Sequence, residues 1–363
     1  MVINIADRQK LALSIIIVVA SALLVLASVY FLNRRQYDIR TSAEDGNCTP
    51  VSNQIIISPS DSSLCLTLRG AVNAISDASQ YTIRFQPGEY QIDEAINIDG
   101  KNLLISGDSE SGSKAVKINL TNQINIKNST VSFEWLEMKA NTNKAVISGN
   151  GLKELNLQQT HLSNVGGSVL ELARVDKVNI KNSEIFSSAR AAQMSEVVDI
   201  TLDNCRIHDN NQGIEISKSS GNLTSNIISN QSTDAIVINN PLSFIVDHNT
   251  FSDNRSGALT IQNTEGSQDK YFEITNNIIT NNNSGLVVKN LNQDYLNIEN
   301  NNIWNNATNT TGVENIIGEN GNISEDPLFG PSFCLNQNSP AIYGEINRGE
   351  FMGYKRFNKP LCN

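Results

Sequence analysis

Apolar residues recur at a nearly fixed interval through the middle of the chain. One such position repeats every 21 to 28 residues, at Leu162, Ile185, Ile207, Ile228, Phe251, Ile279 and Ile303. A second apolar position follows the first at a similar interval, at Leu170, Ala192, Ile214, Ile236, Leu259 and Leu286. A repeat of about 22 residues predicts a solenoid, because each unit is too small to bury its apolar side except against its neighbours.

Within each repeat the apolar residues lie two apart, which is the spacing of a strand. The position five before the first repeat position is always aliphatic, at Leu157, Ile180, Leu202, Leu223, Val246, Ile274 and Ile298. Helical repeats of this length would need apolar residues three and four apart over ten or more positions, and the units lack them. The pattern therefore predicts an all-β solenoid in which parallel strands pair with the coils above and below.

Small polar residues, Asn above all, separate the predicted strands. Two before the first repeat position stand Thr160, Ser183, Cys205, Asn226, Asn249, Asn277 and Asn301. Two after it stand Asn164, Ser187, Asp209, Asn230, Asp253, Asn281 and Asn305. Asn tolerates left-handed backbone angles and can bond to an equivalent Asn one coil away, so we expect Asn ladders at the corners.

These repeats resemble the right-handed parallel β-helix family, the pectin-lyase-like superfamily, in its carbohydrate-associated members. The stretch Cys205–Ile216 has its Asn-rich repeat pattern. Cys65–Ile75 and Phe85–Tyr90 are similar to the family's entry segment, and Asp326–Phe329 with Ser339–Ile342 to its exit. The resemblance covers about residues 48 to 363 and implies a single-stranded right-handed β-helix, for which we expect three strands per turn. We expect four residues to point inward: Ile180, Ile200, Ile216 and Ile238.

The chain divides into one solenoid and an N-terminal anchor. Residues 11–32 contain no charged side chain and are long enough to cross a bilayer, which predicts one transmembrane helix, although a cleaved signal peptide is the alternative. A short tail (1–10) precedes this span and a linker (33–47) follows it. The β-helix should occupy 48–324 and include an N-terminal helical cap, for which the amphipathic run Thr67 to Ala78 is suited. A C-terminal cap should occupy 325–363, where the repeat ends.

The cysteines bear on the compartment. Cys48 and Cys65 bracket the N-terminal cap, Cys334 and Cys362 bracket the C-terminal one, and Cys205 lies in a polar corner position. If each pair forms a disulfide that closes its cap and Cys205 stays a buried thiol, the domain lies outside the cytoplasm, in the periplasm or at the cell surface. Five reduced thiols in a cytosolic domain are the alternative.

The net charge limits the kinds of partner that the protein can bind. The formal net charge of −10 makes nucleic acid an improbable partner and would repel a polyanion unless a basic groove received it. The three histidines, His161, His208 and His248, occupy different repeat positions, so we predict corner or solvated roles and no metal site. No sequence feature calls for a cofactor. Asp247 and His248 resemble the Asp-His-Asn stretch of pectate lyases, but the repeat alone explains them.

The most promising polar cluster follows the second repeat position. Its outward residues include Glu171, Gln193 and Glu215, and Arg174, Arg190 and Lys218 lie nearby. Coils about 4.8 Å apart would separate Glu171 from Glu215 by roughly 10 Å, near the upper edge of an inverting glycosidase geometry. We assign candidate catalytic roles to Glu171, Glu215, Arg190 and Lys218, and substrate binding to Arg174, Gln193 and Trp304. A charge-paired solvent face is the structural alternative.

Two functions follow from this cluster. The first is a membrane-anchored extracytoplasmic protein that binds or organises polysaccharide without turnover. The second is a polysaccharide lyase, epimerase or glycosidase. Ser14, Ser21 and Ser28 recur every seven residues in the apolar span, which allows self-association through the transmembrane helix.

Overall fold

The computed structural model describes residues 46–354 and Cys362, except for positions 62, 111, 113–114, 266–270, 315 and 343–351. The predicted transmembrane helix, 11–32, lies outside these residues. Among the helices that the structure does describe, none is long and apolar enough to cross a membrane.

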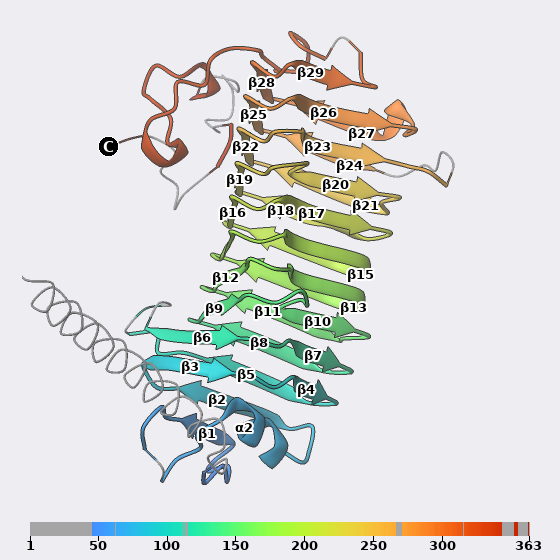
Figure 1. Cartoon of the computed structure of the whole chain (residues 1–363). Helices are drawn as coiled ribbons and strands as arrows, with labels where there is room; N and C mark the ends of the chain where they lie inside the picture. Colours follow the sequence, from blue (N-terminus) through green and yellow to red (C-terminus); the bar gives the residue numbers. More distant parts are fainter. Residues whose placement is uncertain are drawn as a thin grey trace, which may run out of the picture. The chain divides into compact units, whose positions relative to one another are not determined.

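The described chain is a parallel β-solenoid with three strands per coil (Figure 1). The strands form three ladders along the solenoid axis, which we call A, B and C. Ladder A contains β1 (Gln54–Ile57), β2 (Gln80–Phe85), β5 (Asn102–Ser106), β8 (Thr130–Glu134), β11 (Glu154–Gln158), the second halves of β13 (Ser168–Lys181) and β15 (Arg190–Asp203), β18 (Ser220–Thr224), β21 (Ser243–Asp247), β24 (Phe272–Thr275) and β27 (Leu296–Glu299).

Ladders B and C complete each coil. Ladder B contains β3 (Gly88–Ile92), β6 (Val116–Leu120), β9 (Glu137–Ala140), β12 (His161–Asn164), β14 (Glu184–Phe186), β16 (Arg206–His208), β19 (Ile227–Ser229), β22 (Thr250–Ser252), β25 (Ile278–Thr280) and β28 (Asn302–Trp304). Ladder C contains β4 (Ile96–Asp99), β7 (Ile124–Lys127), β10 (Ile147–Asn150), the first halves of β13 and β15, β17 (Gln212–Ser217), β20 (Ile236–Asn239), β23 (Gly257–Gln262), β26 (Ser284–Lys289) and β29 (Thr308–Thr311).

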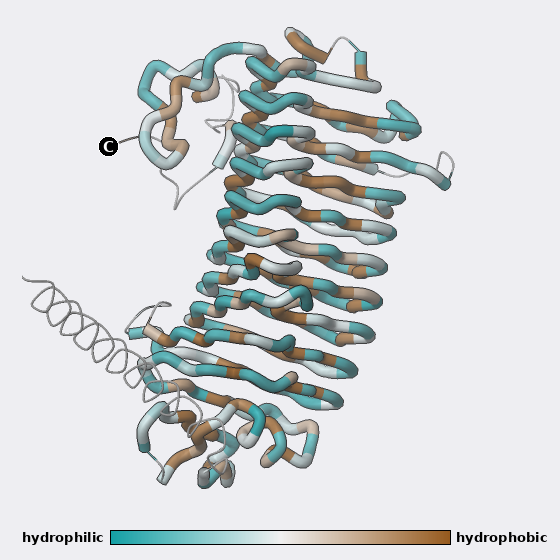
Figure 2. The backbone as a smooth tube through the Cα atoms, viewed as in Figure 1, coloured by the Kyte–Doolittle hydropathy of each residue, from teal (hydrophilic) through white to brown (hydrophobic). Residues whose placement is uncertain are grey.

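The predicted inward residues lie in the core. Ile180, Ile200, Ile216 and Ile238 are each fully buried, and every described strand pairing between coils is parallel. The interior is a continuous column of aliphatic and Phe side chains, while hydrophilic residues gather at the corners (Figure 2). The strand-spaced apolar pattern therefore predicted both the period and the facing of the strands.

A buried Asn ladder runs along the corner between ladders A and B. Asn226, Asn249, Asn277 and Asn301 each donate from Nδ2 to the Oδ1 of the next Asn, over 2.9–3.0 Å, and the row ends at Asn322. The same side chains also bond backbone groups that the corner would leave unpaired. The prediction of an Asn ladder at this corner is confirmed.

The second corner differs from the prediction by one residue. The positions two after the first repeat position, such as Asp209, Asn281 and Asn305, adopt left-handed φ angles of 52–58°. The buried ladder lies one residue later, where Asn254 donates to Asn282 and Asn282 to Asn306. The backbone bends at the residue with the left-handed φ angle, so the side chain of the next residue points inward.

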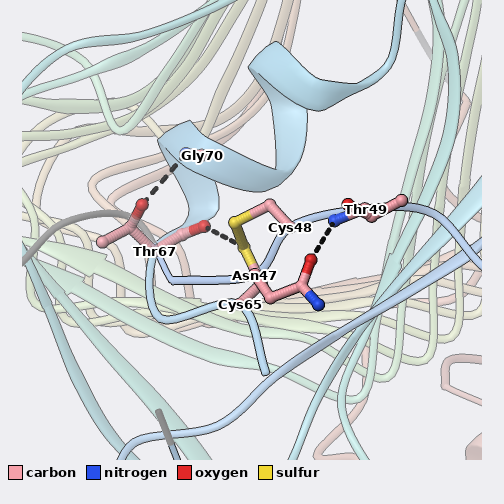
Figure 3. Close-up of a disulfide and its surroundings, with 6 residues drawn as sticks. All are labelled: Asn47, Cys48, Thr49, Cys65, Thr67 and Gly70. Atoms are coloured by element: carbon pink, nitrogen blue, oxygen red, sulfur yellow. Dashed lines mark hydrogen bonds between the residues drawn. A yellow bond between two sulfur atoms is a disulfide. The ribbon is translucent and has the colours of Figure 1, made fainter. Parts of the chain in front are cut away.

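Helix α2 (Leu68–Ala74) lies at the N-terminal end of the solenoid (Figure 1). Thr67 caps it by accepting a hydrogen bond from the Gly70 amide, and Leu68, Ala71, Val72 and Ile75 are buried. The Cys48–Cys65 disulfide lies beside the start of this helix (Figure 3). The helix ends at Ala74 and is therefore shorter than the amphipathic run Thr67 to Ala78 that the sequence predicted.

The C-terminal segment folds back along ladder B. The 3-10 helices η2 (Pro331–Phe333) and η3 (Pro340–Ile342) belong to it, and a third, η1 (Gln293–Tyr295), lies earlier, before β27. Met352 packs with Leu335 and Ala341 against Ile278, an outward residue of ladder B. The amides of Gly353 and Tyr354 donate to Asn276 and Thr250. The second disulfide, Cys334–Cys362, joins two parts of this segment.

Both cysteine pairs are bonded as predicted. Their α-carbons are 4.4 and 5.1 Å apart, within the range that a disulfide requires. Cys205 is buried and unpaired, and burial raises the pKa of its thiol to about 12. Such a thiol is protonated at neutral pH and is no nucleophile.

Candidate functional site

The predicted polar row exists on the outer face of ladder C. Glu171, Gln193 and Glu215 are paired in register on β13, β15 and β17, with their buried neighbours facing the core. The same column begins several coils earlier, at Asn97, Asn125 and Ser148, and it becomes apolar at Val237. Polar side chains thus occupy one outward position over six successive coils.

The basic residues around this row are already engaged. Arg190 donates to Gln212 Oε1 over 2.7 Å and to Gln193 Oε1, so it lies within the row. Arg174 donates to Asn150 Oδ1 over 2.7 Å. Lys218 pairs with Glu265 over 2.7 Å, and this hydrogen bond and charge raise the pKa of the lysine.

These contacts set what the cluster can do chemically. A lysine whose pKa is raised stays protonated at neutral pH and is poorly suited to be a general base. Arg174 and Lys218 also have left-handed φ angles, because they form the corner between ladders C and A. The arrangement is therefore better suited to binding a ligand by hydrogen bonds than to removing a proton from it as a general base.

Trp304 is not part of this surface. It lies on β28 of ladder B, in register with Thr280. The structure therefore brings Glu171, Gln193, Glu215 and Arg190 together, and places Arg174 and Lys218 at the adjoining corner. The substrate-binding role predicted for Trp304 would therefore belong to a different ladder.

A concave pocket lies on the outer face of ladder B. Its volume is about 330 Å³, at the lower end of the range for ligand sites. The coils contribute polar and charged side chains and Ile227, while Phe333 and Tyr354 come from the C-terminal segment. The polar residues of the coils that line it are Gln159, His161, Asn182, Ser183, Glu184, Asn204 and Arg206.

Glu184 joins two histidines across three coils beside this pocket. Its Oε2 lies 2.8 Å from His161 Nδ1, and its Oε1 lies 2.8 Å from His208 Nε2. Asp209 Oδ2 lies 2.6 Å from the other ring nitrogen of His208, and Phe186 stacks on that ring with centroids 5.7 Å apart. The side chains form one hydrogen-bonded chain perpendicular to the strands.

The hydrogen bonds of this cluster shift the pKa values of Glu184 and His208. The hydrogen bonds from His161 and His208 lower the pKa of Glu184 well below its usual value, so it stays ionised. Partial burial lowers the pKa of His208, but hydrogen bonds to Glu184 and Asp209 outweigh it and raise that pKa overall. The cluster holds a carboxylate and an imidazole that tends to be cationic.

Sequence reasoning missed this cluster because it followed the histidines and not their neighbours. His161, Glu184 and Arg206 share one repeat position, directly before the first repeat position, and they are in register in the structure. Reading that column would have placed Glu184 next to His161, but it would not have shown the contact with His208, which shares its position with Phe186. His161 and His208 occupy different repeat positions, as the sequence predicted, and Glu184 nevertheless bonds to both of them.

Asp247 and His248 form a separate pair at the corner of a later coil. His248 Nδ1 lies 2.5 Å from Asp247 Oδ2, and Thr275 and Asn276 donate to Asp247 Oδ1. Burial raises the pKa of Asp247, but these hydrogen bonds lower it overall. The pair is built into the corner. Within the part of the chain that the structure describes, no three His, Cys, Asp or Glu side chains are arranged to hold a metal ion.

Comparison with known families agrees with this architecture. Residues 143–290 match the family model described as a right handed beta helix region. The match spans the coils that contain Glu171, Glu215, Glu184 and the three histidines. A search among curated proteins gives no match.

Proposed function

The chain belongs to the right-handed parallel β-helix superfamily, and from this premise we propose that it binds an extended polysaccharide along the outer face of ladder C. The observation that carries the proposal is the in-register polar column from Asn97 to Glu215. Its side chains repeat about every 4.8 Å along the axis. A long row of hydrogen-bonding groups at a regular spacing suits a repeating polymer better than a single small molecule.

The chemistry of the row favours a polymer without negative charge. Glu171 and Glu215 contribute carboxylates, and Gln193 and Arg190 contribute amide and guanidinium donors. Carboxylates accept two hydrogen bonds from neighbouring sugar hydroxyls, whereas they repel a uronate. The net charge of −10 acts in the same direction.

We further propose that the domain is displayed on the outer side of a membrane by residues 11–32. The uncharged length of that segment and the two disulfides support the proposal. Binding without turnover is favoured over the lyase, epimerase and glycosidase alternatives. The reason is that Lys218, Arg174 and Arg190 each have a hydrogen-bond partner in the fold.

The test is a polysaccharide panel incubated with the full-length protein. We expect binding to neutral polymers, and Glu215→Gln should weaken it roughly tenfold, because a hydrogen bond to a charged group contributes about 1.5 kcal/mol or more. Glu273→Gln is the matched control, since Glu273 is a partly buried glutamate on β24 of ladder A.

Two outcomes would contradict the proposal. Equal losses in both variants, or none in Glu215→Gln, would remove ladder C as the binding face. New reducing ends or unsaturated products in the same incubations would establish the enzymatic alternative instead.

A further inference from the structure

The outer face of ladder B is accessible on the middle coils and covered on the later ones. One outward column of this ladder is partly or fully exposed at His161, Glu184 and Arg206. The same column is buried on the coils that follow, at Ile227, Thr250, Ile278 and Asn302. Thr and Asn are buried there as completely as Ile, so the burial is caused by a segment that lies over these coils.

The C-terminal segment provides this cover through contacts that do not involve the solenoid core. Met352 and Leu335 pack against Ile278 in a small hydrophobic cluster that is separate from the core of the coils. The amides of Gly353 and Tyr354 add hydrogen bonds to the same face. The segment can therefore leave ladder B while the strand pairing and the core of the solenoid stay intact.

Two hydroxyl groups on the covered coils have unused bonding capacity. Ser229 and Thr280 occupy the second outward column of ladder B, on either side of Ser252. Their hydroxyl oxygens are buried and have no hydrogen-bond partner within the part of the chain that the structure describes. A buried hydroxyl without a partner costs free energy, which it recovers when it bonds to water. The covered state is therefore one that these groups do not favour.

The two disulfides differ in how accessible they are. Cys48 and Cys65 are buried beside helix α2, with exposed fractions of 9% and 0%. Cys334 and Cys362 are both partly exposed. A disulfide is reduced when a thiolate reaches one of its sulfur atoms, so accessibility favours reduction of the Cys334–Cys362 pair.

The accessible disulfide also restrains the covering segment. Cys334 and Cys362 are 28 residues apart, and Met352, Gly353 and Tyr354 lie in the loop that they close. Loss of the cross-link increases the conformational freedom of this loop once it leaves the coils. The contacts on ladder B are therefore weakened by a chemical change at a distance from them.

We propose that Cys334–Cys362 is a redox switch that controls access to the outer face of ladder B. The thiolate of a dithiol reductant attacks one of the two sulfur atoms, and the other leaves as a thiolate that takes up a proton. The second thiol of the reductant then resolves the mixed disulfide, so the protein gains two thiols and the reductant becomes a disulfide. The freed segment uncovers the later coils and removes Phe333 and Tyr354 from the pocket that they line.

Methionine oxidation can report the release in the full-length protein. Met138, Met194 and Met352 are all buried, but only Met352 belongs to the C-terminal segment. The protein is treated with dithiothreitol, its thiols are alkylated with iodoacetamide, and hydrogen peroxide is added after the reductant is removed. Reduction should speed sulfoxide formation at Met352 about tenfold or more, because the opened form becomes more populated. Met138 and Met194 should stay protected, since both side chains lie in the solenoid core.

Two sets of cysteine variants provide the test and its control. The double variant Cys334→Ser, Cys362→Ser should expose Met352 to peroxide without any reductant. Cys205→Ser removes a cysteine but no disulfide, so its Met352 should react only after reduction. Circular dichroism and melting of each variant show whether it folds, and the reduced wild type tests the proposal even if the double variant does not.

Three outcomes would overturn the switch. Continued protection of Met352 after reduction would show that the segment stays in place without its disulfide. Oxidation of all three methionines would show general unfolding, and equal alkylation of Cys48 and Cys334 would show that the two disulfides are equally reducible. These measurements involve no polysaccharide, so they are independent of the binding proposed for ladder C.

Discussion

At the scale of the residue, single buried asparagines satisfy the corners. Asn277 donates to Val246 O, Thr275 O and Asn301 Oδ1, and it accepts from the backbone and side chain of Asn249. No aliphatic residue can replace these bonds, which explains why an otherwise apolar interior contains a row of amides. The repeat of Asn in the sequence was therefore a reliable sign of a corner, although it did not say which Asn of each pair points inward.

Replacing Asn277 with Ala should destabilise the domain by roughly 3 kcal/mol or more, because several buried donors and acceptors lose their partner at once. Chemical denaturation of the full-length protein measures the change. Asn305→Gly is the control, since Asn305 is exposed with a φ of 52° and Gly adopts that angle freely. A similar loss in the two variants would mean that the buried ladder contributes no special stability.

At the scale of the element, neighbouring strands are linked by an ionisable chain as well as by backbone hydrogen bonds. His161, Glu184 and His208 come from β12, β14 and β16. The raised pKa of His208 means that the folded state binds its proton more tightly than the unfolded state. This contribution is complete below the ordinary histidine pKa of 6.5 and is lost as the pH rises through the folded-state pKa.

As the pH rises above the ordinary histidine pKa of 6.5, the melting temperature should therefore fall more steeply in the wild type than in His208→Gln. The lowered pKa of Glu184 acts at the other end, because its contribution is present above its ordinary value of 4.5 and is lost only as the pH falls well below it. Thermal melts of both proteins across pH measure the effect. Parallel curves above pH 6 would show that His208 does not titrate with folding.

Elements also show what the sequence could and could not reveal about the sites. The register of Glu171, Gln193 and Glu215 followed directly from the repeat, because equal positions in successive coils must lie side by side. The pocket on ladder B did not follow from it, since Phe333 and Tyr354 arrive from a segment that has no repeat. The path of this C-terminal segment is set by the outward apolar residues of ladder B. One of them is Ile278, which Met352 covers.

At the scale of the whole molecule, the proposed location outside the cytoplasm depends on the two disulfides and on the apolar N-terminal segment of the sequence. Cys48–Cys65 lies beside the first coils and Cys334–Cys362 in the segment after the last. The first pair closes a loop around β1, the first strand of ladder A, and the second closes a loop in the segment that follows the repeat. An oxidising environment would therefore stabilise both ends of the domain, while the middle, including the buried thiol of Cys205, would not depend on it.

We expect an outward-facing domain that is retained by a membrane. After cell lysis the full-length protein should sediment with membranes and resist alkaline extraction. In intact cells it should be cleaved by a protease added from outside, or added after removal of an outer membrane. Protein extracted without reductant and denatured should take up one thiol label, at Cys205, and five after reduction. Protection from protease together with five labels before reduction would place the domain in the cytosol. Release of the folded domain into the medium, with a new N-terminus within or shortly after residues 11–32, would instead identify that segment as a cleaved signal peptide.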